Sequence, residues 1–241
     1  MSLLGRLLAS RARPPAHLRE AVLAWQTLPQ ADLSAPLAAT RFVVVDTETS
    51  GLDPRNARVL SVGACSVDNA GLRLDRCFEC TVRQATPTDE ANILVHGLGR
   101  EQQTGGDPPA DALAAFLAFA GKPVFVGFHA LFDATVLRRP IRAELGLDLR
   151  AEWLDLAVLL PSLTRAPERR PWDLDRWLQH LGLDHVARHS AIADAWASAQ
   201  LLLVALARAP DLRIGDARGL FALQRTELGR AVRADAGAPI G

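Results

Sequence analysis

Apolar residues along this chain alternate between short β-branched runs and longer stretches with helical spacing. Strands are expected at 41–46, 59–67, 72–82, 123–128 and 153–156. The short polar turn between the second and third runs favours an antiparallel meander of the first three strands. Helices are expected at 110–120, 131–145, 172–181 and 190–207. Strands first, then alternating helix and strand, predict an α/β fold with a five-stranded mixed sheet flanked by helices.

Two prolines are expected to limit helices in the second half of the chain. Pro140 falls within the stretch 131–145 and is expected to interrupt it, because proline removes a backbone donor and clashes with the preceding turn. A helix that follows the fifth strand is expected to end by Pro161 for the same reason. A loop is expected at 165–171.

The pattern divides the chain into one domain at 41–208 and two extensions. Residues 1–40 carry several arginines, no acid before Glu20 and a helical pattern after Pro14-Pro15, which predicts a basic helical extension. An arginine-rich start is also typical of organellar transit peptides. The helical pattern instead favours a cytoplasmic protein with a basic extension. Residues 209–241 predict an amphipathic helix and a flexible tail.

Composition excludes several classes of protein. The chain has 241 residues, 49% of them hydrophobic, which excludes disorder throughout. Its 27 basic and 27 acidic residues balance, which argues against coating nucleic acid by bulk charge. The longest apolar run, Leu201 to Ala207, is far shorter than the ~20 residues of a membrane span. The chain has no tyrosine, so no mechanism can use a phenol, and its three cysteines fit a reducing compartment.

Two acids end the first strand-like run. Asp46 and Glu48 are two residues apart, so the alternation of a strand puts both carboxylates on one face of the sheet. Like charges this close repel unless cations lie between them, and carboxylate oxygens suit hard ions such as Mg²⁺. The alternative is a solvated strand end.

Two further acids and a histidine occupy similar places. Asp133 follows the run 123–128 at the expected start of a helix, and Asp194 lies one turn into the helix that Ser190 would cap. His189 precedes that helix. Taken singly, Asp133 would complement a helix dipole and His189 would be an ordinary surface histidine. Together, four acids and a histidine beyond strands and at helix starts predict an active site.

These residues resemble a known family. The motifs, in chain order, are Asp46-Thr-Glu48-Thr-Ser-Gly51, Val95-His-Gly-Leu98, Phe128-His-Ala-Leu-Phe-Asp133 and His189-Ser-Ala-Ile-Ala-Asp194. In this order and spacing they resemble the DnaQ-like (DEDD) 3′-5′ exonucleases, and most of all the proofreading epsilon-subunit-like branch. The likeness covers roughly 70% of the chain, from 41 to 207. It implies a ribonuclease H-like fold.

The resemblance also implies a two-metal phosphodiester hydrolysis with Mg²⁺, for which Mn²⁺ can substitute. Asp46, Glu48 and Asp194 would hold the first ion, and Asp46 would share the second with Asp133. His189 would be the general base. The family uses either His or Tyr in that place, and a chain without tyrosine leaves the histidine class, DEDDh.

Substrate contacts follow from the same resemblance. Thr47 and Thr49 resemble positions near the terminal nucleotide, and His96 resembles a histidine lining the same pocket. Phe132 would stack on a base or belong to the core. The family often has His-Asn where this chain has Phe128-His129, so His129 either replaces the asparagine in shaping the loop or leaves a substrate contact missing.

Three functions stay open from the sequence. The first is a metal-dependent 3′-5′ exonuclease of single-stranded or frayed DNA that serves proofreading or repair, with a DNA polymerase or repair complex as a partner. The second is an exoribonuclease of RNA or short oligoribonucleotides. The third is a catalytically silent docking module for such a complex. Two side features were also weighed: Cys77 and Cys80 as half of a zinc site, and a strand-guiding role for the arginines Arg138, Arg139, Arg142, Arg165, Arg169 and Arg170.

Overall fold

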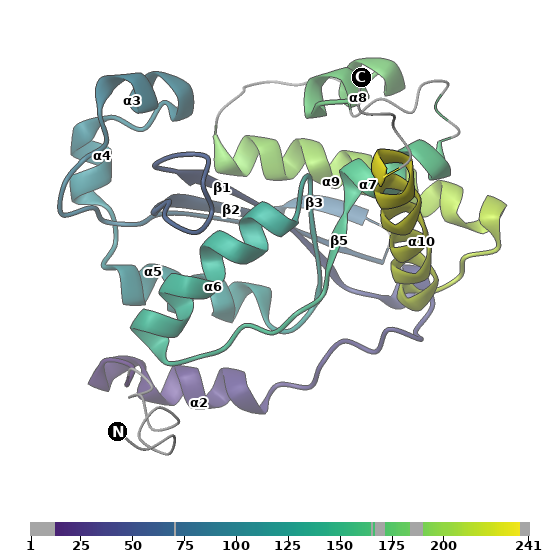
Figure 1. Cartoon of the computed structure of the whole chain (residues 1–241). Coiled ribbons are helices and arrows are strands. Elements are labelled where there is room, and N and C mark those ends of the chain that lie inside the picture. The colour runs from purple at the N-terminus through teal and green to yellow at the C-terminus, as the bar shows by residue number, and fades with distance from the viewer. Residues whose placement is uncertain (1–12, 70, 165, 167–171, 184–189, 237–241) are drawn as a thin grey trace.

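A five-stranded mixed sheet forms the centre of the protein. The computed structural model describes residues 13–236 except 70, 165, 167–171 and 184–189 (Figure 1). Its strands are β1 (Phe42–Thr49), β2 (Val59–Asp68), β3 (Gly71–Thr81), β4 (Val124–Gly127) and β5 (Trp153–Asp155). The strand order is β3-β2-β1-β4-β5, with antiparallel pairing among the first three strands and parallel pairing of β1, β4 and β5. The predicted sheet, with its antiparallel meander, is therefore confirmed.

Helices surround this sheet. They are α2 (Arg19–Thr27), α3 (Glu90–His96), α4 (Arg100–Gly105), α5 (Pro109–Ala120), α6 (Leu131–Leu145), α7 (Leu156–Leu163), α8 (Leu174–Leu181), α9 (Ala191–Arg208) and α10 (Ala217–Ala236). Short 3₁₀ turns lie at Ala16–Leu18, Leu37–Ala39 and Ala209–Leu212. The sequence pattern did not predict α3 and α4, because helices of 7 and 6 residues are too short to show a period.

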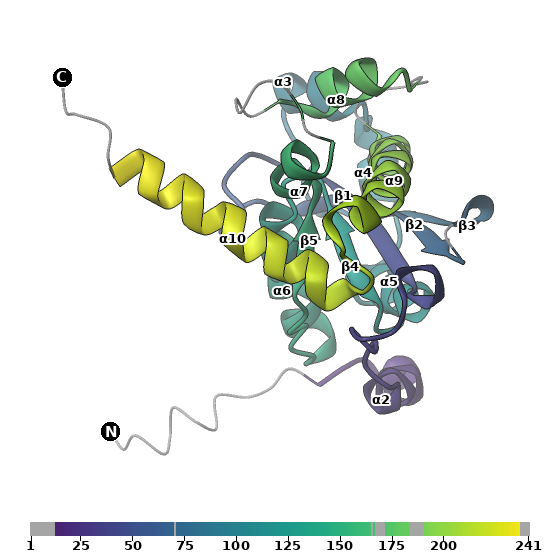
Figure 2. The ribbon, with the colours of Figure 1, turned by 90° about the vertical axis from the view of Figure 1, so that its right-hand side faces the viewer.

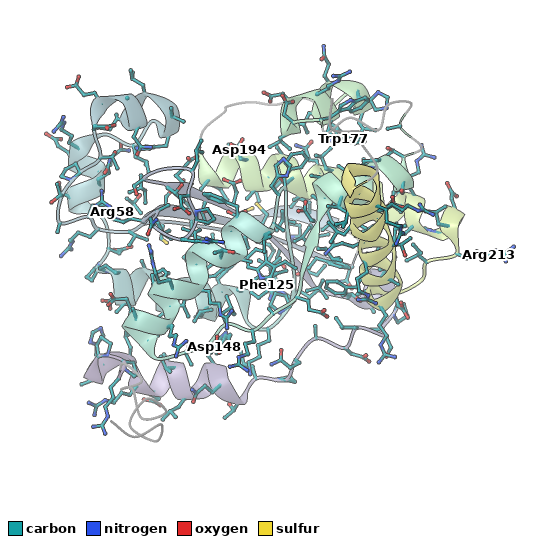
Figure 3. All side chains as sticks on the ribbon, viewed as in Figure 1. Arg58, Phe125, Asp148, Trp177, Asp194 and Arg213 are labelled. Carbon is teal, nitrogen blue, oxygen red and sulfur yellow. The ribbon has the colours of Figure 1, made fainter. Side chains whose placement is uncertain are left out.

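The two faces of the sheet carry separate cores. Alternate residues of β1 point to opposite sides, so Phe42 and Val44 pack with α7, α8 and α9, whereas Val43 and Val45 pack with α5 and α6. Figure 1 shows α8 and α9 on one side and α5 and α6 on the other. Trp177 belongs to the first core and Phe125 to the second (Figure 3).

Two prolines lie inside helices, contrary to prediction. α6 continues through Pro140 and α7 continues through Pro161. A proline in a helix interior costs about 3 kcal/mol. Side chains on both sides of Pro140 are buried, including Leu137 and Ile141, and their packing on the sheet outweighs the lost bond.

The long helix α9 is a core helix. The segment Ala191–Leu212 is long and apolar enough to cross a membrane by length and composition, with a mean hydropathy of 1.3. Counting uninterrupted apolar runs in the sequence did not reveal this. However, 56% of that window is buried within the fold, and the helix packs on β1 and β2. Burial against the sheet accounts for its composition.

The two extensions meet beside the sheet. The N-terminal helix α2 packs on α5, and Trp25 Nε1 donates a hydrogen bond of 3.0 Å to the carbonyl of Gly121. The following segment joins the start of α10, because Leu37 N donates to Gly215 O at 3.0 Å and Arg218 N donates to Leu33 O at 3.1 Å. α10 then extends away from the body (Figure 2). The division into 1–40, 41–208 and 209–241 stays a prediction, and residues 1–12 and 237–241 lie outside the described residues.

Candidate active site

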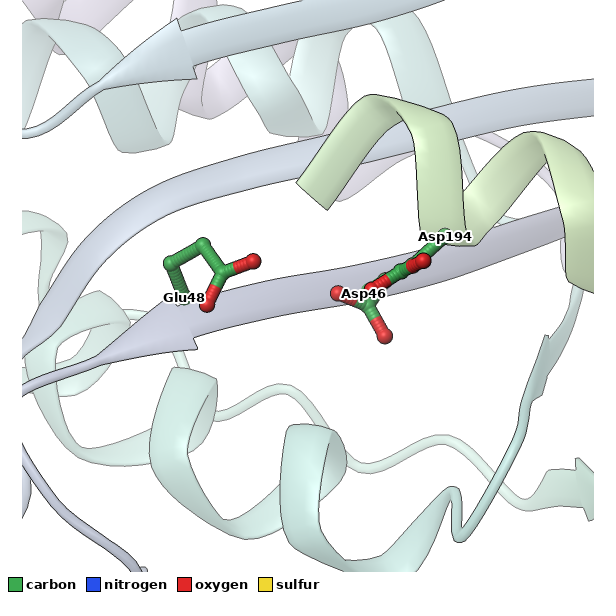
Figure 4. A group of neighbouring side chains, drawn as sticks. All are labelled: Asp46, Glu48 and Asp194. Carbon is green, nitrogen blue, oxygen red and sulfur yellow. The ribbon is translucent and has the colours of Figure 1, made fainter. Parts of the chain in front are cut away.

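Three of the four predicted acids gather at the end of β1. Ligand oxygens of Asp46, Glu48 and Asp194 all lie within 4.8 Å of one another (Figure 4). Asp46 and Glu48 are partly exposed, whereas Asp194 is buried on the first turn of α9. A register shift between Glu48 and Thr49 marks a β-bulge at the strand end, a feature that often turns side chains beside active sites.

A glycine lets α9 come this close to the sheet. Gly63 of β2 lies opposite Asp46 in the β1–β2 register. A Cβ atom at this position would lie 2.2 Å from the carbonyl carbon of Ala191, at the start of α9. The helix therefore rests directly on the backbone of β2, and this contact brings Asp194 to Asp46. Ser190 is the N-cap residue of α9 as predicted, but its side chain makes no capping hydrogen bond.

The donor set of this cluster fits a hard divalent cation. Three carboxylates at one point repel one another unless positive charge lies between them. Oxygen ligands, and carboxylates above all, are those that Mg²⁺ and similar ions bind. A search of the described acids, histidines and cysteines for three ligand atoms close enough to hold one ion finds these three carboxylates.

Asp133, in the first turn of α6, contacts the residue between the two acids of β1. Thr47 Oγ1 donates a hydrogen bond of 2.7 Å to Asp133 Oδ1, and Asp133 is 4% exposed. Burial raises the pKa of Asp133 to about 7; the hydrogen bond from Thr47 opposes this rise and the negative charge of Asp155 adds to it. Asp133 is not part of the three-carboxylate group found among the described residues. Its predicted share in a second ion stays a prediction.

His129 shapes the turn before α6. Its backbone is left-handed, with φ +62°, and its N–H donates to Asp155 Oδ1 at 3.0 Å. Asparagine adopts this conformation readily, and histidine is among the residues that tolerate it. His129 thus takes over the shaping of the loop, which was one of the two expectations. Its side chain is exposed, and its contact with a substrate stays a prediction.

The other predicted substrate residues differ in their access to a ligand. Thr49 is half-buried, and its Oγ1 donates to the carbonyl of Gly51 at 2.8 Å. His96 is 2% exposed. Its Nε2 lies 3.0 Å from Asn92 Oδ1, and its Nδ1 accepts a bond of 2.9 Å from the N–H of Leu98. Burial lowers the pKa of His96. Its bonds to Asn92 and Leu98 show that His96 holds α3 from within, and its predicted place in the pocket lining stays a prediction.

Two neighbouring apolar residues at the start of α6 differ in their exposure. Phe132 is partly buried and packs against the core on the α5 and α6 side, which is the second of the two readings made from the sequence. Its neighbour Leu131 is 77% exposed, so the apolar side chain available to a ligand there is Leu131.

Several other predicted residues have structural roles or lie outside the described part. Arg139 donates to the backbone carbonyls of Arg55 and Ala57, and Arg138 Nε donates to Asp148 at 2.9 Å. Both arginines therefore make contacts within the fold, and their strand-guiding role stays a prediction. Cys77 Sγ lies 3.2 Å from Cys65 Sγ, and Cys80 is buried, so the two do not form half a metal site. The predicted base His189, the loop expected at 165–171 except Ala166, and the arginines Arg165, Arg169 and Arg170 lie outside the described residues.

Sequence reasoning missed Asp155. It ends β5, and its side chain caps α7 by accepting from Ala157 N at 3.0 Å. Burial raises its pKa, and the charge of His129 opposes the rise. The signal that found Asp46 and Asp133, an acid directly after a buried strand, applies to Asp155 as well.

Comparison with known proteins agrees with this geometry. The model of the RNase_T exonuclease family matches residues 43–202. The DNA polymerase III PolC-type protein of Thermotoga petrophila is 29% identical over 162 residues, which are 67% of this chain and 12% of that protein. The DNA polymerase III subunit epsilon-like protein of Rhodobacter capsulatus is 31% identical over 171 residues, 70% of this chain and 24% of that protein. The chain thus spans a quarter or less of the length of these relatives.

A solved structure shares the fold. E. coli exonuclease I in complex with a dT13 oligonucleotide aligns with a TM-score of 0.60 at 19% identity, over 72% of this chain and 42% of that chain. At this identity the likeness speaks for the fold alone. It confirms the predicted ribonuclease H-like architecture.

Proposed function

The chain belongs to the exonuclease family, and from that premise we propose that it is a metal-dependent 3′-5′ exonuclease of single-stranded or frayed DNA ends. It releases nucleoside 5′-monophosphates one at a time. The observation that carries this proposal is the meeting of Asp46, Glu48 and Asp194 within 4.8 Å. A structural protein has no need to gather three carboxylates beside the end of a buried strand.

Each acid has a place in the proposed reaction. Asp46, Glu48 and Asp194 would hold one Mg²⁺, and Asp46 with Asp133 would hold a second, with Mn²⁺ as a substitute. Two such ions, when bound, stabilise the attacking and the leaving oxygen of an in-line displacement. His189 takes the proton of the attacking water, since a neutral imidazole near pH 7 suits this role. Its position five residues before Asp194 supports the assignment.

The surroundings of the acids support an unpaired strand as substrate. Three of the most exposed apolar side chains described belong to elements that carry or contact site residues: Leu52 at 92%, Leu94 at 85% and Leu131 at 77%. They follow β1, lie on α3 and begin α6, respectively. Exposed apolar side chains near a polar site favour a ligand with apolar faces, which unpaired bases provide. We assign Thr47, Thr49 and His129 to contacts with the terminal nucleotide.

The relatives support DNA and a replication or repair role. Two of them are named as DNA polymerase III proteins, and exonuclease I was solved with an oligodeoxynucleotide. We therefore propose proofreading or repair in the cytoplasm, in association with a DNA polymerase or repair complex. RNA is the second candidate substrate, which the experiment below separates.

The experiment uses 5′-labelled single-stranded DNA, a duplex with a mismatched 3′ end and RNA of the same sequence. With Mg²⁺ or Mn²⁺ we expect a ladder of fragments that shorten from the 3′ end of DNA, and no ladder in EDTA. Asp46→Asn should lower the rate by ~10³-fold or more, because the lost charge would weaken binding of both ions that stabilise the reacting oxygens. Asp75→Asn is the control, since Asp75 pairs with Arg73 on the exposed strand β3.

Three outcomes would contradict parts of this proposal. A wild-type rate in Asp46→Asn would show that the assigned residues do not form the active site. Internal cuts instead of a ladder would show that the protein is not an exonuclease. Faster shortening of RNA than of DNA would favour the exoribonuclease.

A further inference from the structure

The edge strand β5 is covered by a side chain from α10. Gln224 Nε2 donates to the carbonyl of Trp153 at 2.9 Å, and the N–H of Asp155 donates to Gln224 Oε1 at 2.6 Å. One side-chain amide thereby pairs with both backbone groups that an edge strand would leave open. α10 begins at Ala217, beyond the family match at 43–202. A helix outside the shared domain therefore fixes the strand that carries Asp155 (Figure 2).

Asp155 in turn holds the turn after β4. Its Oδ1 accepts from His129 N and from Ala157 N, both at 3.0 Å. A left-handed backbone is unfavourable for a residue other than glycine and persists only when its surroundings fix it. At His129, with φ +62°, the bond to Asp155 is such a restraint.

The turn at His129 sets the start of α6 and hence Asp133. Phe132 N donates to His129 O at 3.0 Å, and this bond forms the turn that leads into α6. Gly127, which pairs with Asp155 across β4 and β5, is closely packed, because a Cβ there would lie 3.1 Å from Ala130 Cα. The loop 127–130 is thus pressed against β4. Asp133 follows three residues later and meets Thr47.

We propose that Asp155 and Gln224 are positioning residues of the nuclease site. Gln224 holds the edge of β5, Asp155 holds the left-handed turn at His129, and that turn places Asp133 beside Thr47. This inference rests on the proposed function. It makes the C-terminal helix a working part of the active site rather than an appendage.

A simpler role for Asp155 would be the N-cap of α7 alone. That role needs only the bond to Ala157 and predicts lost stability with unchanged turnover. Asp173 provides the matched control, because it caps α8 by accepting from Arg176 N at 2.8 Å. Asp173→Ala removes a cap without touching the turn at His129.

The test compares full-length wild-type protein with Asp155→Ala, Asp155→Asn, Gln224→Ala and Asp173→Ala. We expect Asp155→Ala to lower kcat by about 10- to 100-fold, the range for residues that orient metal ligands, with KM changed less than about threefold. Asp155→Asn keeps an acceptor oxygen and should retain most of kcat. Gln224→Ala should lower kcat several-fold, and Asp173→Ala should leave it unchanged.

A second readout does not need activity. In metal-free protein, amide hydrogen exchange at His129 should accelerate in Asp155→Ala, and exchange at Asp155 should accelerate in Gln224→Ala, because each variant removes the acceptor of that N–H. Asp173→Ala should change neither.

The outcomes separate the two proposals. If wild-type protein degrades no substrate, the proposed function fails, and unchanged exchange at His129 in Asp155→Ala would then overturn the positioning network too. If wild-type protein is active and Asp155→Ala keeps its kcat, the positioning role fails alone. If Asp155→Ala does not fold, Gln224→Ala decides, and wild-type kcat with wild-type exchange at Asp155 overturns the proposal.

Discussion

At the end of β1, successive side chains point to opposite faces of the sheet, and the two faces hold their acids by different means. On the α9 face, Asp46 and Asp194 meet because Gly63 lets a helix rest on the backbone of β2. On the α6 face, Asp133 is held by a hydrogen bond from Thr47 and follows a turn that Asp155 restrains. The α9 face depends on close packing that leaves no room for an added methyl group, whereas the α6 face depends on hydrogen bonds that single substitutions can remove. Substitutions on the two faces should therefore act in different ways, through packing on the α9 face and through hydrogen bonds and burial of a carboxyl group on the α6 face.

Among tests of how the two faces hold their acids, the largest effect on turnover is expected from Gly63→Ala. The added Cβ would lie 2.2 Å from Ala191 C and 2.3 Å from Ile192 N, both backbone atoms, so α9 must move away from β2. Such overpacking costs about 1–3 kcal/mol of unfolding free energy. A shift of the acids by ~1 Å would lower kcat by about 10²-fold. Urea unfolding and the ladder assay measure the two effects.

Gly105→Ala is the control for this variant, because nothing lies within 4 Å of a Cβ at that position. Its stability and rate should match the wild type. A wild-type rate in Gly63→Ala would show that the backbone contact is not what brings Asp194 to Asp46.

A middle-sized effect is expected on the α6 face from pH. Burial raises the pKa of Asp133 from 3.8 to about 7, so between these values the folded protein holds a proton that the unfolded chain has released. The free energy of unfolding should therefore fall as pH rises from about 4 to about 7, by roughly a few kcal/mol in total. Urea unfolding of metal-free protein across this range measures the slope. Asp133→Asn should flatten it, and an unchanged slope in that variant would assign the effect to another group.

The smallest effect is expected at the start of α6, where neighbours differ in burial. Leu131→Ala should change stability by less than about 0.5 kcal/mol, because the side chain is 77% exposed. It should weaken single-stranded DNA binding a few-fold in an Asp46→Asn background, measured by fluorescence anisotropy. Phe132→Ala, which removes a side chain packed on the core, should cost about 2 kcal/mol of stability. Equal binding by wild type and Leu131→Ala would leave Leu131 without a substrate role.

Local patterns were enough to predict much of this protein. Short strand-like runs predicted all five strands, and the clearest of these, β1, β2 and β4, are almost wholly buried between the helical layers. The alternation of a strand placed Asp46 and Glu48 on one face, and the motif order added Asp194. Each of these inferences depends on residues close together in the chain or on a resemblance of motifs.

What the sequence did not predict depends on contacts between distant residues. In the sequence, Gly63 looks like any glycine within a strand. Only the structure shows that α9 lies against it. From its place before a helix, Asp155 would be taken only for a helix cap, and its bond to His129 is visible only in the structure. The local sequence also does not predict a left-handed backbone at His129. The helix α6 passes through Pro140 because burial of its apolar side outweighs a local penalty. These features depend on contacts between residues that lie tens of positions apart in the sequence, so local patterns do not reveal them.

The junction between the two extensions has a consequence for how such a domain is used in longer proteins. Leu33 and Leu37 are bonded to Arg218 and Gly215, so the chain enters and leaves the domain side by side. A domain whose entry and exit are adjacent can be inserted into another chain at a single point without stretching either part. The relatives that carry a matching segment are several times longer than this chain. The hydrogen bonds that close this junction in the present chain, outside the matched residues 43–202, would suit such an insertion.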